Sequence, residues 1–164
     1  MTHINLLVMV LSILLACEVQ AKPISKQTAV VAASGETTLT ARSSKFDVKV
    51  SVRTRSVEGG DHFGLPGGYV ERSHVEGVDI VVGGNLIWLN RSVFCDLFDV
   101  HLAELRLEGG KGILAFEGGD ASESFWVKIE FDAKQVKRRL VGSGMTPGKA
   151  SIVTSYQMSV LEDE

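Results

Sequence analysis

The sequence predicts an all-β protein, an antiparallel sandwich or a partly open barrel of about seven to eight strands, with at most one short helix near 132–140. Apolar and polar residues alternate over residues 46–53 and again over 125–132, which is the period of a half-buried strand. Five glycine pairs punctuate the chain. Gly-Gly favours tight hairpin turns, because both residues reach positive φ without steric strain.

An apolar run, Ile4–Ala16, lies at the start of the chain. It is shorter than the stretch of about 20 residues that a transmembrane helix needs, and its position is typical of the hydrophobic part of a signal peptide. Val19 and Ala21 supply the short side chains that precede a signal-peptidase cut. We therefore predict a signal peptide over residues 1–21 and an exported protein, periplasmic or extracellular.

A second processing route overlaps the first. The segment Leu14-Leu15-Ala16-Cys17 resembles the lipobox of bacterial lipoproteins, in which the cysteine is lipidated and becomes the new N-terminus. Leu15 departs from the small residue usual at its position. This alternative predicts a lipoprotein signal that ends before Cys17, a lipid anchor on Cys17, and no other membrane contact.

Charge and cysteine content narrow the class of protein. The formal net charge of −3 leaves no basic excess to neutralise phosphates, so we expect no nucleic-acid partner. After a cut behind Ala21, Cys95 is the remaining cysteine, and no intrachain disulfide can form. We interpret Cys95 as a small buried hydrophobe beside Phe94 and Leu97.

Residues 22–44 are rich in Ser, Thr, Ala and Gly, and their apolar cluster is confined to 29–33. This composition predicts a tether, or a loosely attached strand, ahead of a β domain over residues 45–164. In that domain the first strand turns Phe46, Val48, Val50 and Val52 to one face.

Shorter strands are predicted between and after the two alternating segments. Gly83-Gly84 should join a hairpin of residues 78–82 and 85–89, and glycines at 109–112 should join residues 103–107 to 113–116. Residues 132–140 open with a helix N-cap candidate, yet a turn and a strand from Val136 to Val141 are favoured. The remaining predicted strands are a short one at 93–95 and a last one over 150–161.

The segment Ser124–Asp132 is the strongest strand in the sequence. Its apolar residues Phe125, Val127, Ile129 and Phe131 occupy alternate positions. A register slip of one residue would turn all of them to water. We therefore expect a central strand that fixes the register of its sheet.

No motif for an enzyme is complete. The string closest to a serine nucleophile elbow, Val141–Gly144, misses the required Gly-x-Ser-x-Gly spacing. His62, His74 and His101 could each act as a base, or together bind zinc or copper, because histidine is the commonest ligand for these ions. Their spacing fits no metal motif, so we assign neither catalytic residues nor a cofactor.

Two segments are candidates for ligand binding. The glycine-dense stretch 57–68 would carry His62 and Phe63 at the tip of a loop that closes on a ligand. Trp126 falls on the strand face opposite Phe125. It either packs under a second layer or is exposed, and an exposed indole is a candidate contact for a sugar ring or a partner protein.

These observations together predict a non-catalytic binding or accessory module of the bacterial envelope, whose partner is an envelope protein or a small ligand. One alternative is a small hydrolase or metal-dependent enzyme that uses the histidines. Another is a carrier of apolar ligands, in which the apolar strand faces line the cavity of a barrel instead of filling a core.

Overall fold

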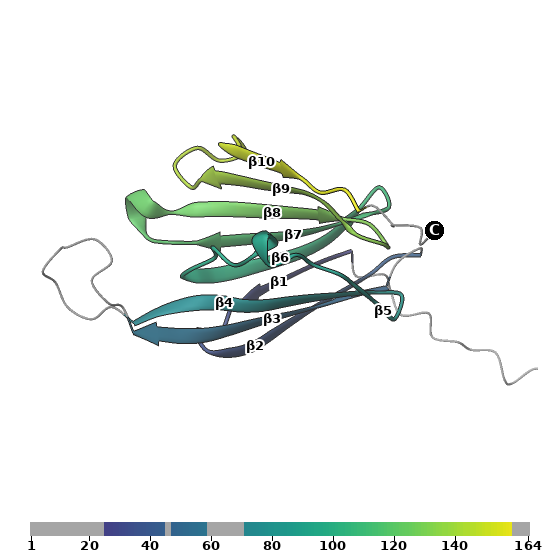
Figure 1. Cartoon of the computed structure of the whole chain (residues 1–164), viewed down its shortest axis with the longest axis horizontal. Coiled ribbons are helices and arrows are strands. Elements are labelled where there is room, and N and C mark those ends of the chain that lie inside the picture. The colour runs from purple at the N-terminus through teal and green to yellow at the C-terminus, as the bar shows by residue number, and fades with distance from the viewer. Residues whose placement is uncertain (1–24, 45–46, 59–70, 159–164) are drawn as a thin grey trace, which may run out of the picture.

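The computed structural model describes residues 25–44, 47–58 and 71–158. They form two antiparallel sheets packed face to face (Figure 1). The six-stranded sheet has the order β1 (Lys26–Val30), β6 (Val100–Glu108), β7 (Lys111–Gly118), β8 (Phe125–Phe131), β9 (Val136–Ser143) and β10 (Ile152–Ser155). The four-stranded sheet has the order β2 (Gly35–Arg42), β3 (Asp47–Glu58), β4 (Glu71–Val82) and β5 (Asn85–Ile87).

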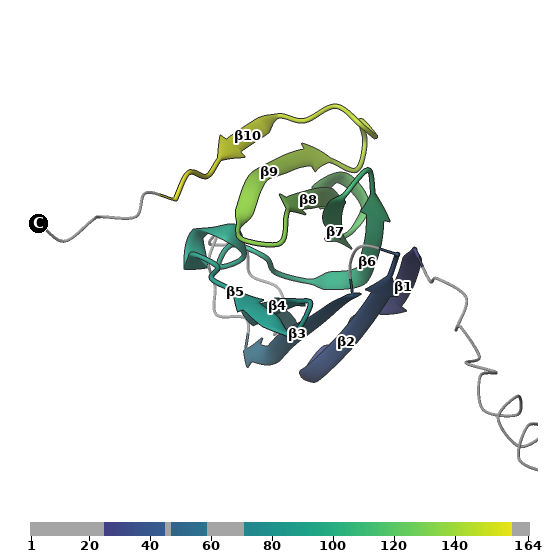
Figure 2. The same cartoon turned by 90° about the vertical axis from the view of Figure 1, so that its right-hand side faces the viewer.

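The all-β prediction is confirmed, and the structure is an open sandwich rather than a closed barrel. Figure 2 shows β1 beside β2 where the sheets approach each other, and β10 at the opposite end of the six-stranded sheet. Ten strands occur in the described residues, more than the predicted number. Two short 3-10 turns, η1 (Arg91–Val93) and η2 (Ala121–Glu123), complete the elements found there.

The predicted alternation is the basis of the core. Of the four apolar residues of β8 that we expected inside, Phe125 is only partly buried and packs against the core. The other three, Val127, Ile129 and Phe131, are at most 1% exposed, and so are Val48, Val50 and Val52 of β3. All belong to one hydrophobic cluster between the sheets. The apolar strand faces therefore fill a core. Phe46, predicted on the same face of β3, lies outside the described residues.

Both predicted glycine hairpins are present. Gly83 and Gly84 have φ of 57° and 85°, and Gly109 and Gly110 have φ of 56° and 83°. Positive φ at both central residues matches the right-handed twist of the flanking strands. The second turn is shorter than predicted, because residues 111 and 112 already belong to β7.

Residues 26–42, for which we predicted a tether or a loosely attached strand, form the strands β1 and β2, so the tether alternative does not hold for them. Leu39 and Ala41 on β2 are at most 1% exposed, and Val31, where the chain passes from one sheet to the other, is 5% exposed. Threonines and charged residues alternate with these apolar side chains. An edge strand needs one apolar face only, so its composition resembles that of a linker.

The predicted strand at 93–95 is also wrong. This segment forms η1 and a turn, in which Val93, Phe94 and Leu97 are buried while Cys95 is exposed. The chain crosses the open side of the sandwich here, so side chains at irregular spacing reach the core. Val75 N–H on β4 donates to the carbonyl of Leu97 over 3.0 Å.

The C-terminal part follows the favoured prediction only in part. Residues 136–143 form a strand, and no helix occurs over 132–140. The last strand is confined to Ile152–Ser155, although we predicted one over 150–161. All four of its residues are exposed, because β10 extends the six-stranded sheet beyond the four-stranded one (Figure 2). Residues 159–164 lie outside the described residues.

Candidate functional site

The outer face of the six-stranded sheet, which points away from the core, is hollowed. Two adjoining hollows of about 470 Å³ and about 300 Å³ share Ala115, Glu117 and Lys128. We call them together the outer-face groove. Its floor follows from the register of β7 and β8, which pairs Ala115 with Lys128 and Glu117 with Trp126. Directly paired residues share a face, so these four side chains are neighbours.

Trp126 forms part of the larger hollow. It lies on β8 opposite Gly142 of β9, and its ring atoms Cε2 and Cζ2 would be 2.4 Å from a Cβ at position 142. Glycine therefore makes room for the indole. Nζ of Lys128 lies over the ring, 5.1 Å from its centroid. Nε1 of Trp126 is buried and has no hydrogen-bond partner among the described residues.

The loop after β9 forms a wall of the larger hollow, to which Gly144, Pro147 and Gly148 contribute. A hydrogen bond from Gly144 N–H to the carbonyl of Ser124, 2.7 Å long, ties this loop to the start of β8. The absence of a side chain at Gly144 permits this approach, because a Cβ there would be 2.4 Å from Oγ of Ser124. The wall is thus held by main-chain contacts.

The smaller hollow is lined by charged side chains, most of them already paired. Lys26 Nζ lies 2.8 Å from Glu104 Oε2, and Arg106 Nε lies 3.3 Å from Glu108 Oε1. Exposed ion pairs of this kind contribute little to stability, but they cancel much of the charge on this part of the sheet. Neither Glu117 nor Lys128 forms an ion pair within the described residues.

The structure brings together only some of the predicted site residues. Trp126 and His101 both line the larger hollow. His62 and Phe63 lie outside the described residues, as does Cys17. The predictions that depend on them, a ligand-binding loop and a lipid anchor, stay predictions.

His74 has a structural role on β4 of the four-stranded sheet. Its Nε2 lies 3.1 Å from the carbonyl oxygen of Cys95, to which it can donate, and its ring stacks on Phe98 with centroids 4.5 Å apart. These contacts fasten the segment after η1 to β4. Within the described residues no group of three or more His, Cys, Asp or Glu could hold a metal ion.

Three residues of the groove, Ala115, Glu117 and Lys128, were missed by sequence reasoning. They come from two strands whose register depends on the connection through η2. Of the four residues on the floor of the groove, Trp126 alone had a signal, because the alternation of β8 placed it opposite the core. Trp126 is half-buried on the outer face, packed against Gly142 and not under a second sheet.

Comparison with known proteins adds no relative: the chain matches no family model, no curated protein and no solved structure. No helix in the part of the chain that the structure describes is long and apolar enough to cross a membrane. The chain is thus characterised by its fold, an open β-sandwich. Its candidate site is a groove on the outer face of the larger sheet.

Proposed function

We propose that the protein is an exported, non-catalytic binding module that holds a small polar ligand in the outer-face groove. One observation carries the proposal: the half-buried indole of Trp126 lines a hollow of about 470 Å³ together with two charged side chains, Glu117 and Lys128. Ligand sites usually combine an aromatic wall with a few polar groups in a hollow of about 300–1,000 Å³.

Export is supported by the apolar run and the short side chains that precede residue 22. We expect the protein secreted by an expressing bacterium to begin at Lys22, because the signal peptidase cuts behind Ala21. Intact-mass spectrometry of the purified protein measures this directly. A mass that corresponds to diacylated Cys17 would contradict cleavage behind Ala21 and establish the lipoprotein route.

The groove can be tested with the two tryptophans of the chain. We expect that a small polar ligand found by thermal-shift screening binds the mature protein, and that Trp126→Ala weakens this binding by about tenfold or more. Titration calorimetry gives the affinities. The ligands screened should be neutral and charged sugars, amino acids and short peptides.

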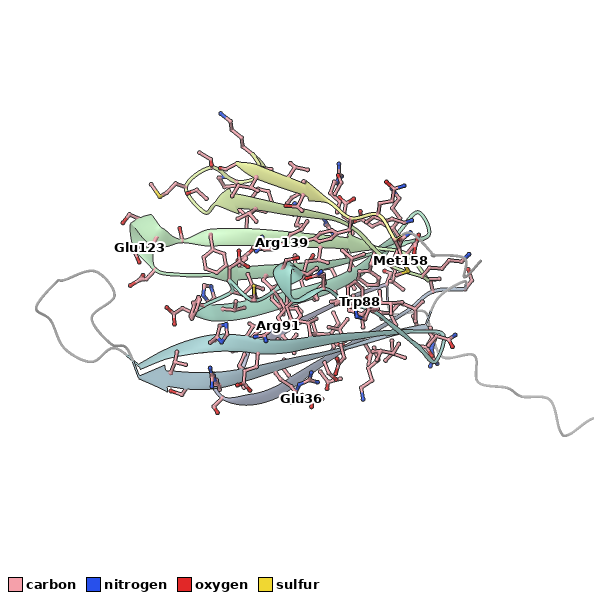
Figure 3. The ribbon with its side chains drawn as sticks, viewed as in Figure 1. Glu36, Trp88, Arg91, Glu123, Arg139 and Met158 are labelled. Atoms are coloured by element: carbon pink, nitrogen blue, oxygen red, sulfur yellow. The ribbon has the colours of Figure 1, made fainter. Side chains whose placement is uncertain are left out.

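Trp88→Ala is the matched control. Trp88 is 67% exposed and follows β5 of the other sheet. Figure 3 shows it far from Glu123, the neighbour of Ser124 at the groove wall. This variant should leave the affinity unchanged. Equal losses in both variants, or no ligand that stabilises the protein, would contradict a binding site in the groove.

A further inference from the structure

We propose, on the basis of the function proposed above, that the ligand of the outer-face groove is a neutral saccharide. The geometry points to this class through one juxtaposition: the indole of Trp126 stands beside a carboxylate, Glu117, and an ammonium, Lys128, over the small floor residue Ala115. Each of the other ligand classes conflicts with one property of the groove.

A peptide conflicts with the backbone of the floor. Peptides that bind sheets usually add a strand to a free edge, where main-chain groups supply the affinity. Strands β7 and β8 are instead paired on both sides, with β6 and β9 as their outer neighbours. The floor is therefore the face of a sheet, and only side chains can recognise what lies on it.

An anionic ligand conflicts with the charge of the groove. Lys26 is engaged by Glu104, and Arg106 lies between Glu104 and Glu108. The two groups outside ion pairs, Glu117 and Lys128, are of opposite sign. An anionic ligand would be attracted by Lys128 and repelled by Glu117, so the groove has no net preference for an anion.

A purely apolar ligand conflicts with the same charges, because it would cover Glu117 and Lys128 without replacing their hydrogen bonds to water. Sugar hydroxyls resolve this conflict. A hydroxyl both donates and accepts, so neighbouring hydroxyls can donate to the Glu117 carboxylate and accept from the Lys128 ammonium. Hydrogen bonds to charged groups are stronger than those between neutral ones.

The indole completes the match. A sugar ring has an apolar face with hydroxyls around its rim, and Trp126 offers an aromatic ring that lines the larger hollow. Lys128 over the ring is a flexible side chain that can turn toward a hydroxyl. The adjoining smaller hollow extends the site along the sheet, which suits more than one sugar unit.

The test is a calorimetric titration of the full mature chain with four panels: neutral oligosaccharides of glucose, mannose and N-acetylglucosamine, uronic and sulfated oligosaccharides, tripeptides, and fatty acids. We expect a neutral oligosaccharide to bind. Glu117→Gln and Lys128→Met should each weaken this binding by about tenfold, since each removes a charge-assisted hydrogen bond. The matched controls, Glu36→Gln on β2 and Lys49→Met on β3, lie on the other sheet and should leave the affinity unchanged.

The possible outcomes separate this inference from the proposed function. Suppose that the ligand is an anionic sugar whose binding Glu117→Gln strengthens, or a tripeptide, or a fatty acid, and that Trp126→Ala weakens its binding. That result would overturn the inference of a neutral saccharide and leave the proposed binding module intact. If no compound of the four panels or of the wider screen binds, both the neutral saccharide and the binding module are overturned. Circular dichroism and thermal melting of each variant confirm that a lost affinity is not lost folding.

Discussion

Ile129→Ala should lower the free energy of unfolding by about 2–5 kcal/mol, the usual range for emptying a buried site. Ile129 is fully buried and lies on β8, which pairs with β7 on one side and β9 on the other. Both neighbouring strands restrict how far the core can collapse into the vacated space. Chemical denaturation of the variant and the wild type measures the difference.

Lys128→Ala, at the adjacent position of the same strand, is the control. Its side chain points to the outer face, where its ammonium lies over the ring of Trp126. We expect a change of about 0.5 kcal/mol or less, the scale of an exposed cation–π contact. Similar losses for Ile129→Ala and Lys128→Ala would contradict the assignment of the two faces of β8, and with it the packing of the sandwich.

Asp96→Ala should lower the free energy of unfolding by about 1–3 kcal/mol, the cost of leaving a buried polar group without its partner. Arg139 on β9 points to the side that η1 and the following turn cover (Figure 3), and its side chain is 7% exposed. Its Nη2 donates to both carboxylate oxygens of Asp96, over 2.7 and 2.9 Å.

Substitution of the other partner of this ion pair should lower the free energy of unfolding much less. Arg139→Met leaves behind only Asp96, whose side chain is 59% exposed and stays hydrated, while methionine fills the space of the alkyl stem. In the Arg139→Met background, Asp96→Ala should then cost about 0.5 kcal/mol or less. A full loss in that background would show that Asp96 stabilises the protein through some contact other than Arg139.

The parts of the fold that sequence predicted are those set by neighbouring residues. The alternation of Val48, Val50 and Val52 and the glycine pair Gly83-Gly84 both depend on backbone geometry within a few residues. The predictions that failed concern segments whose burial depends on contacts with residues far away in the sequence. Cys95 sits among apolar residues in the chain, yet it is exposed, because its segment crosses the side of the sandwich without strand geometry.

The candidate site divides in the same way. Alternation along β8 placed Trp126 on the face opposite Ile129, and the structure agrees. Whether that face was covered or open could not be predicted, because it depends on where the other sheet and the loop after β9 lie. Glu117 and Ala115 join Trp126 only through the register of β7 and β8, and the six residues between these strands do not set that register by themselves.

The sequence by itself thus determined the strand class, the inward face of the main strands and two hairpin turns, because period-two alternation and positive φ at glycine are local properties of the chain. Only the tertiary structure decided that residues 26–42 belong to the domain, that the sheets stay open, and that a groove lies on the outer face of the larger sheet. These features depend on pairings between strands far apart in sequence. Their free energy comes from burial between whole sheets, which no short segment of the sequence encodes.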